Sequence, residues 1–152
     1  MLQYIIDGNN LIGKIGSLKK AYRQNRQSSR EGLIKYLNAF LADKKINLTL
    51  HFDGYPNGPL YLSKGRIIYS EHRTSDTLIK DEIDRFKNPK LIVLVSSDHN
   101  LINYARVNSC KVIKSEEFKR EMQNSSGTNE EFEKVKKLER EKEIFLKLFT
   151  QE

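Results

Sequence analysis

The sequence predicts an α/β fold with a mainly parallel sheet, and three short apolar runs are the main reason. Residues 2–6, 48–52 and 91–95 are mostly apolar, as expected of strands that helices cover on both faces. A polar group containing an aspartate follows each run. Segments with the apolar spacing of helices separate the runs, and this alternation is typical of parallel sheets.

Helices and shorter strands are expected between these runs. Residues 11–27 have few apolar anchors and predict a short helix or an ordered loop. A clearer helix is expected from Ser28 to about residue 45, with Ser28 and Glu31 forming a capping box. Residues 60–70 predict a small hairpin or an edge strand. Further helices are expected over residues 74–86, 101–107 and from 115 onward, with a last strand at 111–113.

The chain is expected to form one domain followed by a helical tail, since 152 residues suit a single domain. This domain would span residues 1–122. Residues 123–129 have the composition of a linker. Residues 130–152 predict a charged amphipathic helix whose apolar stripe packs on the domain or, alternatively, on a partner.

Composition excludes several classes of protein. The single cysteine, Cys110, excludes an intramolecular disulfide and a cysteine-rich zinc site. No apolar stretch is long enough to cross a membrane, and the N-terminus lacks the basic leader of a secretory signal. A cytoplasmic location is the simplest expectation.

Positive charge is concentrated near the N-terminus of a chain with a net charge of +7. Residues 14–30 contain no acid, and clustered cations of this kind attract the phosphates of nucleic acids. The alternative is a solvated, lysine-rich surface. The basic residues of this segment are Lys14, Lys19, Lys20, Arg23, Arg26 and Arg30.

Four aspartates form the candidate catalytic and metal site. Asp7, Asp53 and Asp98 follow predicted strands, and Asp76 opens a predicted helix. The carboxyl ends of parallel strands share one edge of a sheet, where ligands bind. Carboxylates suit Mg²⁺ or Mn²⁺, and such an ion activates water and stabilises a leaving oxyanion. Taken singly, each aspartate is also explained as a turn or N-cap residue.

Polar neighbours of these aspartates are candidates for substrate binding. Asn9 and Asn10 would orient Asp7 or bind a phosphate, or only serve the turn. Ser97 would position a phosphate or cap a helix, and His99 would touch substrate. His51 is expected inside the protein and His72 on its surface.

Four motifs occur in order along the chain. They are Ile5-Ile6-Asp7-Gly8-Asn9-Asn10, Phe52-Asp53-Gly54, Thr74-Ser75-Asp76 and Val95-Ser96-Ser97-Asp98. This set resembles the YacP-like branch of the NYN domains, which are PIN-like ribonucleases. The resemblance covers roughly residues 3–121 and leaves the tail outside. It implies a three-layer α/β/α fold and metal-dependent RNA cleavage in RNA processing or decay, in some members at the ribosome. The site residues that it implies are Asp7, Asn9, Asp53, Asp76 and Asp98.

The sequence departs from the family pattern at the helix that Asp76 opens. Thr77 stands where a second aspartate is usual, and Lys80 where an acid is common. Asp81 is the candidate replacement. His99 stands where an arginine is often found.

The main prediction is therefore a Mg²⁺- or Mn²⁺-dependent endoribonuclease of single-stranded RNA, with residues 14–30 guiding the RNA backbone. The alternative is a non-catalytic RNA- or ribosome-binding module that retains the PIN-like fold. A phosphatase with an aspartyl nucleophile ranks last, because Asn9 stands where that chemistry needs a second aspartate.

Overall fold

The computed structural model, which describes residues 1–124 and 137–148, is built on a five-stranded sheet in the order β3-β2-β1-β4-β5. Every neighbouring pair of strands is parallel. Asp7 lies opposite His51, and Ile6 opposite Val95, so the three longest apolar runs end at one edge. The strands are β1 (Leu2–Asp7), β2 (Ile46–Phe52), β3 (Arg66–Tyr69), β4 (Ile92–Val95) and β5 (Lys111–Ile113).

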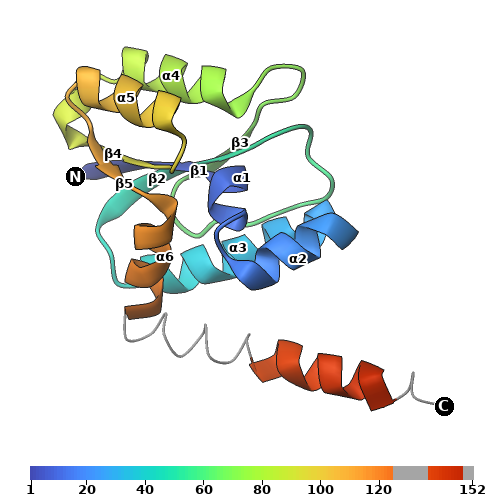
Figure 1. The fold of residues 1–152 in the computed structure, drawn as a ribbon. Helices are drawn as coiled ribbons and strands as arrows, with labels where there is room; N and C mark the ends of the chain where they lie inside the picture. Colours follow the sequence, from blue (N-terminus) through green and yellow to red (C-terminus); the bar gives the residue numbers. More distant parts are fainter. Residues whose placement is uncertain (125–136, 149–152) are drawn as a thin grey trace.

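Helices cover both faces of the sheet (Figure 1). One layer contains α4 (Ser75–Arg85) and α5 (His99–Val107), and a short 3₁₀ helix, η1 (Pro89–Leu91), leads into β4. The other layer contains α1 (Gly8–Ile12), α2 (Gly16–Gln24), α3 (Arg26–Leu41) and α6 (Ser115–Asn124). The predicted three-layer α/β/α fold is thus confirmed.

Two apolar cores separate these layers. The larger one joins the sheet to α1, α3 and α6 and includes Ile6, Leu37 and Phe118. The smaller one lies under α4 and α5 and includes Ile5 and Ile79. Ile5 and Ile6 are both fully buried, because successive strand residues point to opposite faces and both faces are covered.

Some predicted elements differ in detail. Residues 11–27 contain the end of α1, all of α2 and the start of α3. Of the two alternatives for residues 60–70, the edge strand is confirmed: β3 lies at the edge of the sheet, parallel to β2. The hairpin is wrong, because residues 60–62 form no strand. The capping box at Ser28 is also wrong. Asn25 caps α3, and its Oδ1 accepts hydrogen bonds from the backbone N–H of Gln27 at 2.9 Å and of Ser28 at 3.3 Å.

The predicted tail is described only in part. Gln123 and Asn124 continue α6 rather than begin a linker, and residues 125–129 lie outside the described residues. A helix is present over residues 137–148. It lies beside α2 and α3, and Lys20 Nζ is 2.6 Å from Glu143 Oε1 across this contact.

None of the described helices is long and apolar enough to span a membrane.

Candidate metal and RNA site

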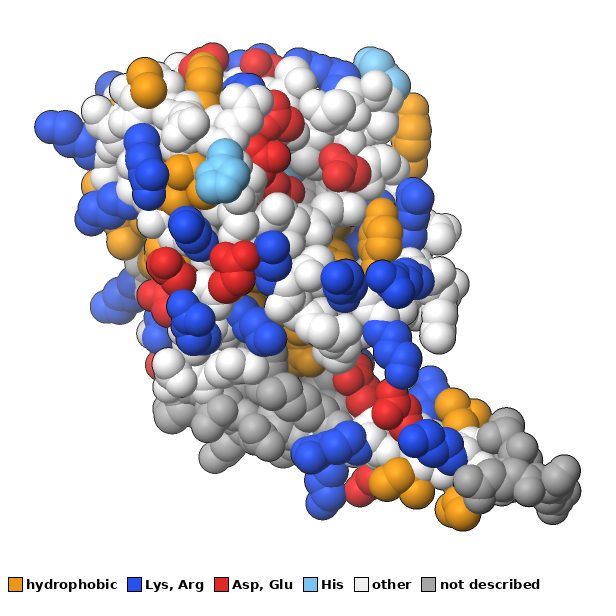
Figure 2. Space-filling view, viewed as in Figure 1, with side chains coloured by type: hydrophobic (Ala, Val, Ile, Leu, Met, Phe, Trp, Pro, Cys, Tyr) orange, Lys and Arg blue, Asp and Glu red, His pale blue; other side chains and the backbone are white. Residues whose placement is uncertain are grey.

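One pocket at the carboxyl edge of the sheet brings the predicted aspartates together. Asp7 ends β1, Asp53 follows β2, Asp76 lies in the first turn of α4 and Asp98 caps α5. All four line the pocket, with Arg73, Ser75 and Leu101 among their neighbours. Figure 2 shows acidic side chains gathered in the upper half of one face, with Lys and Arg side chains below and to the sides.

Asp7 is the buried member of this group, with 9% of its surface exposed. Its Oδ2 accepts a hydrogen bond from Ser96 Oγ at 3.1 Å. The pKa of the Asp7 carboxyl is raised to about 6, mainly because the group is buried; the hydrogen bond from Ser96 opposes this shift, and the nearby charges of Asp53 and Asp98 add to it. Among the described residues, no cationic side chain lies within 4.0 Å of the Asp7 carboxylate to compensate its charge.

Asp53 is held in place mainly through its backbone. Its N–H donates to Asn9 Oδ1 at 3.0 Å, and its carbonyl accepts from Arg30 Nη2 at 2.7 Å. Its carboxylate Oδ1 accepts from the N–H of Ser75 at 3.1 Å, which joins the end of β2 to the start of α4. Gly54 follows with φ of +88°, a left-handed conformation that favours glycine.

Arg30 is a positioning residue, and the prediction that it guides RNA is wrong. Only 4% of its surface is exposed. Its guanidinium donates to the carbonyls of Asp53 and of Tyr55, the latter at 2.9 Å. It also lies 5.3 Å from the ring centroid of Phe52 and 5.2 Å from that of Tyr69. A buried cation therefore fixes the turn that carries Asp53.

Asp98 and Asp76 have structural partners of their own. Asp98 Oδ1 accepts from the N–H of Leu101 at 3.0 Å and so caps α5. The N–H of Asp98 donates to Ser96 Oγ at 3.1 Å, so Ser96 connects Asp98 with Asp7. Asp76 Oδ2 lies 3.2 Å from Lys80 Nζ, while Thr74, rather than Asp76, caps α4.

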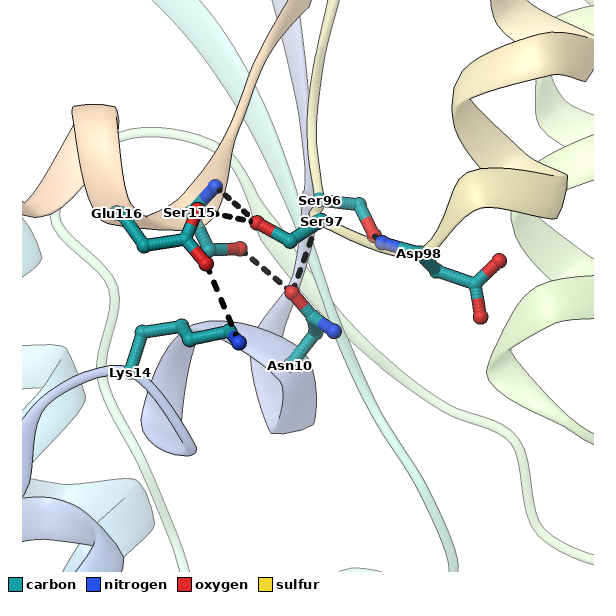
Figure 3. Close-up of polar contacts among 7 residues, drawn as sticks. All are labelled: Asn10, Lys14, Ser96, Ser97, Asp98, Ser115 and Glu116. Atoms are coloured by element: carbon teal, nitrogen blue, oxygen red, sulfur yellow. Dashed lines mark hydrogen bonds and ion pairs between the residues drawn. The ribbon is translucent and has the colours of Figure 1, made fainter.

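A polar network ties α1 and the segment after β4 to the start of α6 (Figure 3). Asn10 Oδ1 accepts from the N–H of Ser97 at 2.9 Å and from Ser115 Oγ at 2.7 Å. Ser97 Oγ donates to Glu116 Oε2 at 2.7 Å and accepts from the N–H of Ser115 at 3.0 Å. Asn10 Oδ1 and Ser97 Oγ thus help to hold the fold together. The role of these two residues in phosphate binding stays a prediction.

Glu116 closes this network on the outside. The hydrogen bond from Ser97 and the ion pair with Lys14, whose Nζ lies 3.2 Å from Glu116 Oε1, lower the pKa of Glu116 to about 2. Glu116 was not among the predicted site residues, whereas the hydroxyl of Ser96 was a candidate either for a place beside the metal or for a cap. The position of Ser96, directly after β4, was the available signal.

The exposed cations of residues 14–30 are not equivalent. Lys14 and Lys20 form ion pairs with Glu116 and Glu143. Arg26 lies 5.4 Å from the ring centroid of Tyr22. Lys19 and Arg23 are exposed on α2.

The burial of His51 and the exposure of His72 are as predicted. His51 is buried, whereas His72 is exposed. His99 is exposed at the first position of α5, directly after Asp98.

The predicted replacement acid lies elsewhere. Asp81 Oδ2 is 2.9 Å from Arg73 Nη2, and Asp81 is not among the residues that line the aspartate pocket. Thr77 Oγ1 lies 2.8 Å from Thr74 Oγ1, at the start of α4. Neither residue restores the missing carboxylate.

The carboxylate oxygens of the pocket are suitable ligands for a hard divalent cation. Asp7, Asp53 and Asp98 have no cationic side chain within 4.0 Å among the described residues. In the same part of the chain, no three acidic, histidine or cysteine side chains lie close enough to enclose a metal ion. Mg²⁺ usually takes one or two protein carboxylates and keeps several waters, so these residues fit it without such a cage.

The parallel sheet, its two helical layers and the acidic pocket define a PIN-like domain of the nuclease type. The YacP-like NYN domain family matches residues 4–151, and the chain belongs to this family. The match includes the tail, so the expectation that the tail lies outside the family is wrong.

Two solved structures have the same fold. The crystal structure of Rae1 (YacP) from Bacillus subtilis gives a TM-score of 0.72 at 21% identity, covering 98% of this chain and 92% of the other. A mutant of that protein gives 0.71 at 21% identity, covering 93% and 86%. No curated protein matches the chain significantly.

Proposed function

We propose that the protein is a divalent-metal-dependent endoribonuclease that cleaves single-stranded RNA. The observation that carries this proposal is the shared pocket of Asp7, Asp53, Asp76 and Asp98, contributed by four separate elements. Membership of a nuclease-type family supports it. A role in RNA processing or mRNA decay, a cytoplasmic location and the ribosome as a partner belong to the same proposal and rest on the family resemblance.

The aspartates would hold Mg²⁺ or Mn²⁺, which supplies an activated water and stabilises the leaving oxyanion. Asp7, Asp53 and Asp98 would hold it directly or through water, because no cation within 4.0 Å competes for them among the described residues. Asp76 would contribute to metal binding once the ion replaces Lys80 as the partner of its carboxylate. Arg30 and Asn9 keep Asp53 at the pocket through its backbone, and Ser96 keeps Asp7 and Asp98 together.

RNA would reach the pocket over the exposed cations of α2, with Lys19 and Arg23 attracting its phosphates. The positive charges of Lys14, Lys20 and Arg26 would add to this attraction of the RNA phosphates. His99, exposed beside Asp98, would contact the substrate.

The test is cleavage of a labelled single-stranded RNA by the purified protein in Mn²⁺ and in Mg²⁺. Asp7→Asn is expected to abolish internal cleavage, whereas Asp43→Asn, at an exposed carboxylate outside the pocket, leaves it unchanged. Equal cleavage by the wild type and by Asp7→Asn would reject the assignment.

A non-catalytic RNA-binding module is the second candidate, and the ion pair between Asp76 and Lys80 favours it. With Lys80 neutralising Asp76 and Thr77 in place of an acid, α4 offers the metal less negative charge. This alternative predicts salt-sensitive RNA binding without cleavage in either metal. Metal-dependent scission that Asp7→Asn removes would exclude it.

A further inference from the structure

A second cavity, of about 490 Å³, lies between α4 and the strands β2 and β3. It is separate from the carboxylate cluster of the aspartate pocket, and polar side chains from several elements line it. They include Gln3, Asn47, His51, Arg66, Arg73 and Arg85.

The floor of this cavity is unusual for a parallel sheet. Gln3, Thr49 and His51, on the two strands β1 and β2, are exposed by only 7%, 0% and 1%. Gln3 Nε2 donates to Thr49 Oγ1 at 2.9 Å. Strands of a parallel sheet that helices cover are normally apolar. Gln3 and His51 line the cavity, so its floor carries hydrogen-bonding groups in place of the usual apolar side chains.

Two arginines at this cavity have no acidic partner. Arg66 begins β3 and Arg85 ends α4, both are exposed, and neither forms an ion pair among the described residues. The acids of the cavity are already engaged: Asp81 by Arg73 at 2.9 Å, and Glu82 by His51 Nε2 at 2.9 Å. Guanidinium groups bind phosphate through paired N–H donors, so Arg66 and Arg85 suit an anionic, phosphate-bearing ligand.

The cavity leads to the aspartates. Arg73 lines both the cavity and the aspartate pocket. The α4 helix begins at Ser75, whose N–H is 3.1 Å from Asp53 Oδ1, and its 11 residues run to Arg85. At 1.5 Å per residue, α4 is about 16 Å long, so the arginines extend the site well beyond one phosphate.

We propose that this cavity holds the single-stranded RNA on one side of the cleaved bond. Arg66 and Arg85 bind its phosphates, and the amides of Gln3 and Asn47 contact base edges. Phe86, which also lines the cavity, supplies an apolar surface for a base. The inference rests on the proposed function, because it extends the substrate path of the aspartate pocket.

The test is the affinity of the full chain for a short fluorescent single-stranded RNA, measured by anisotropy in EDTA at several salt concentrations. Arg66→Gln and Arg85→Gln are each expected to weaken binding roughly 10-fold, as loss of a charged hydrogen bond does. Each also reduces the slope of log affinity against log salt by about 0.7. Arg106→Gln, at an exposed arginine on α5 outside the cavity, is the matched control.

Equal affinity of the two cavity variants and Arg106→Gln would overturn the inference, and so would a wild-type protein that does not bind the RNA. Because EDTA prevents metal-dependent chemistry, this readout is independent of cleavage. Binding that depends on Arg66 and Arg85, without cleavage in Mn²⁺ or Mg²⁺, would uphold the cavity and reject the proposed nuclease.

Discussion

Arg30 Nη2 donates a hydrogen bond of 2.7 Å to the carbonyl of Asp53, although the two residues are 23 positions apart in the chain. The buried guanidinium thereby links α3 to the turn that presents an exposed carboxylate. Its hydrogen bonds to Asp53 and Tyr55 and its position over two aromatic rings make it part of the fold.

Replacing Arg30 is expected to destabilise the protein. Arg30→Met leaves two carbonyls without their donor and removes the contacts with Phe52 and Tyr69, a loss of about 2–4 kcal/mol in the free energy of unfolding. Urea denaturation measures it. Arg23→Met, at an exposed arginine of α2, is the control and should cost less than about 0.5 kcal/mol. Similar midpoints for the two variants would show that Arg30 does not hold the turn.

Asp7 predicts a dependence of stability on pH in metal-free protein. Its pKa is about 6 in the folded chain, against 3.8 ordinarily. Between these values the folded state binds more protons than the unfolded state, so stability falls as pH rises from about 4 to 6 and then levels. Asp7→Asn should remove this fall and stabilise the protein at pH 7 by no more than about 3 kcal/mol.

This pH dependence is measured by urea denaturation in EDTA from pH 4 to pH 8. Asp43→Asn, at an exposed aspartate, should keep the wild-type profile. A wild-type profile in Asp7→Asn would mean that another group is responsible.

Asn10 is expected to matter for stability rather than for substrate binding. Asn10→Ala removes the acceptor of the Ser97 N–H and of Ser115 Oγ, of which Ser115 is fully buried. Unpaired buried donors cost about 1–3 kcal/mol. Asn100→Ala, on the exposed side of α5, is the control for thermal unfolding. If both variants melt at the wild-type temperature, the network around Asn10 does not hold α6.

The start of α3 gives a direct comparison between the two candidate caps. Asn25→Ala should destabilise the protein by about 1 kcal/mol, because Asn25 Oδ1 accepts two backbone N–H groups. Ser28→Ala, inside the helix at an exposed position, should change stability by less than about 0.5 kcal/mol. Chemical denaturation distinguishes them, and a larger loss at Ser28 would favour the capping box.

Much of the fold could be predicted because the strands are buried on both faces. Ile5 and Ile6 pack into opposite cores, and such strands appear in sequence as continuous apolar runs. The same reasoning located Asp7, Asp53 and Asp98, since the carboxyl ends of parallel strands share one edge. The edge strand β3 was harder to place, because its partner in the sheet depends on the path of the whole chain.

The tasks of individual polar residues could not be predicted in the same way. Arg30 has the sequence context of an exposed, RNA-binding arginine, yet it turns inward to backbone carbonyls. Asp81 lies one turn after Thr77, which made it the candidate for the missing acid, but Arg73 pairs with it outside the pocket. In both cases a long-range partner decides the role, and helical spacing carries no information about that partner.

The most direct test of the central claim is a crystal of the protein soaked in Mn²⁺ and measured at a wavelength where manganese scatters anomalously. We expect an anomalous peak in the pocket lined by Asp7, Asp53 and Asp98, and its loss in Asp7→Asn crystals. A wild-type crystal with no manganese in that pocket would contradict the claim.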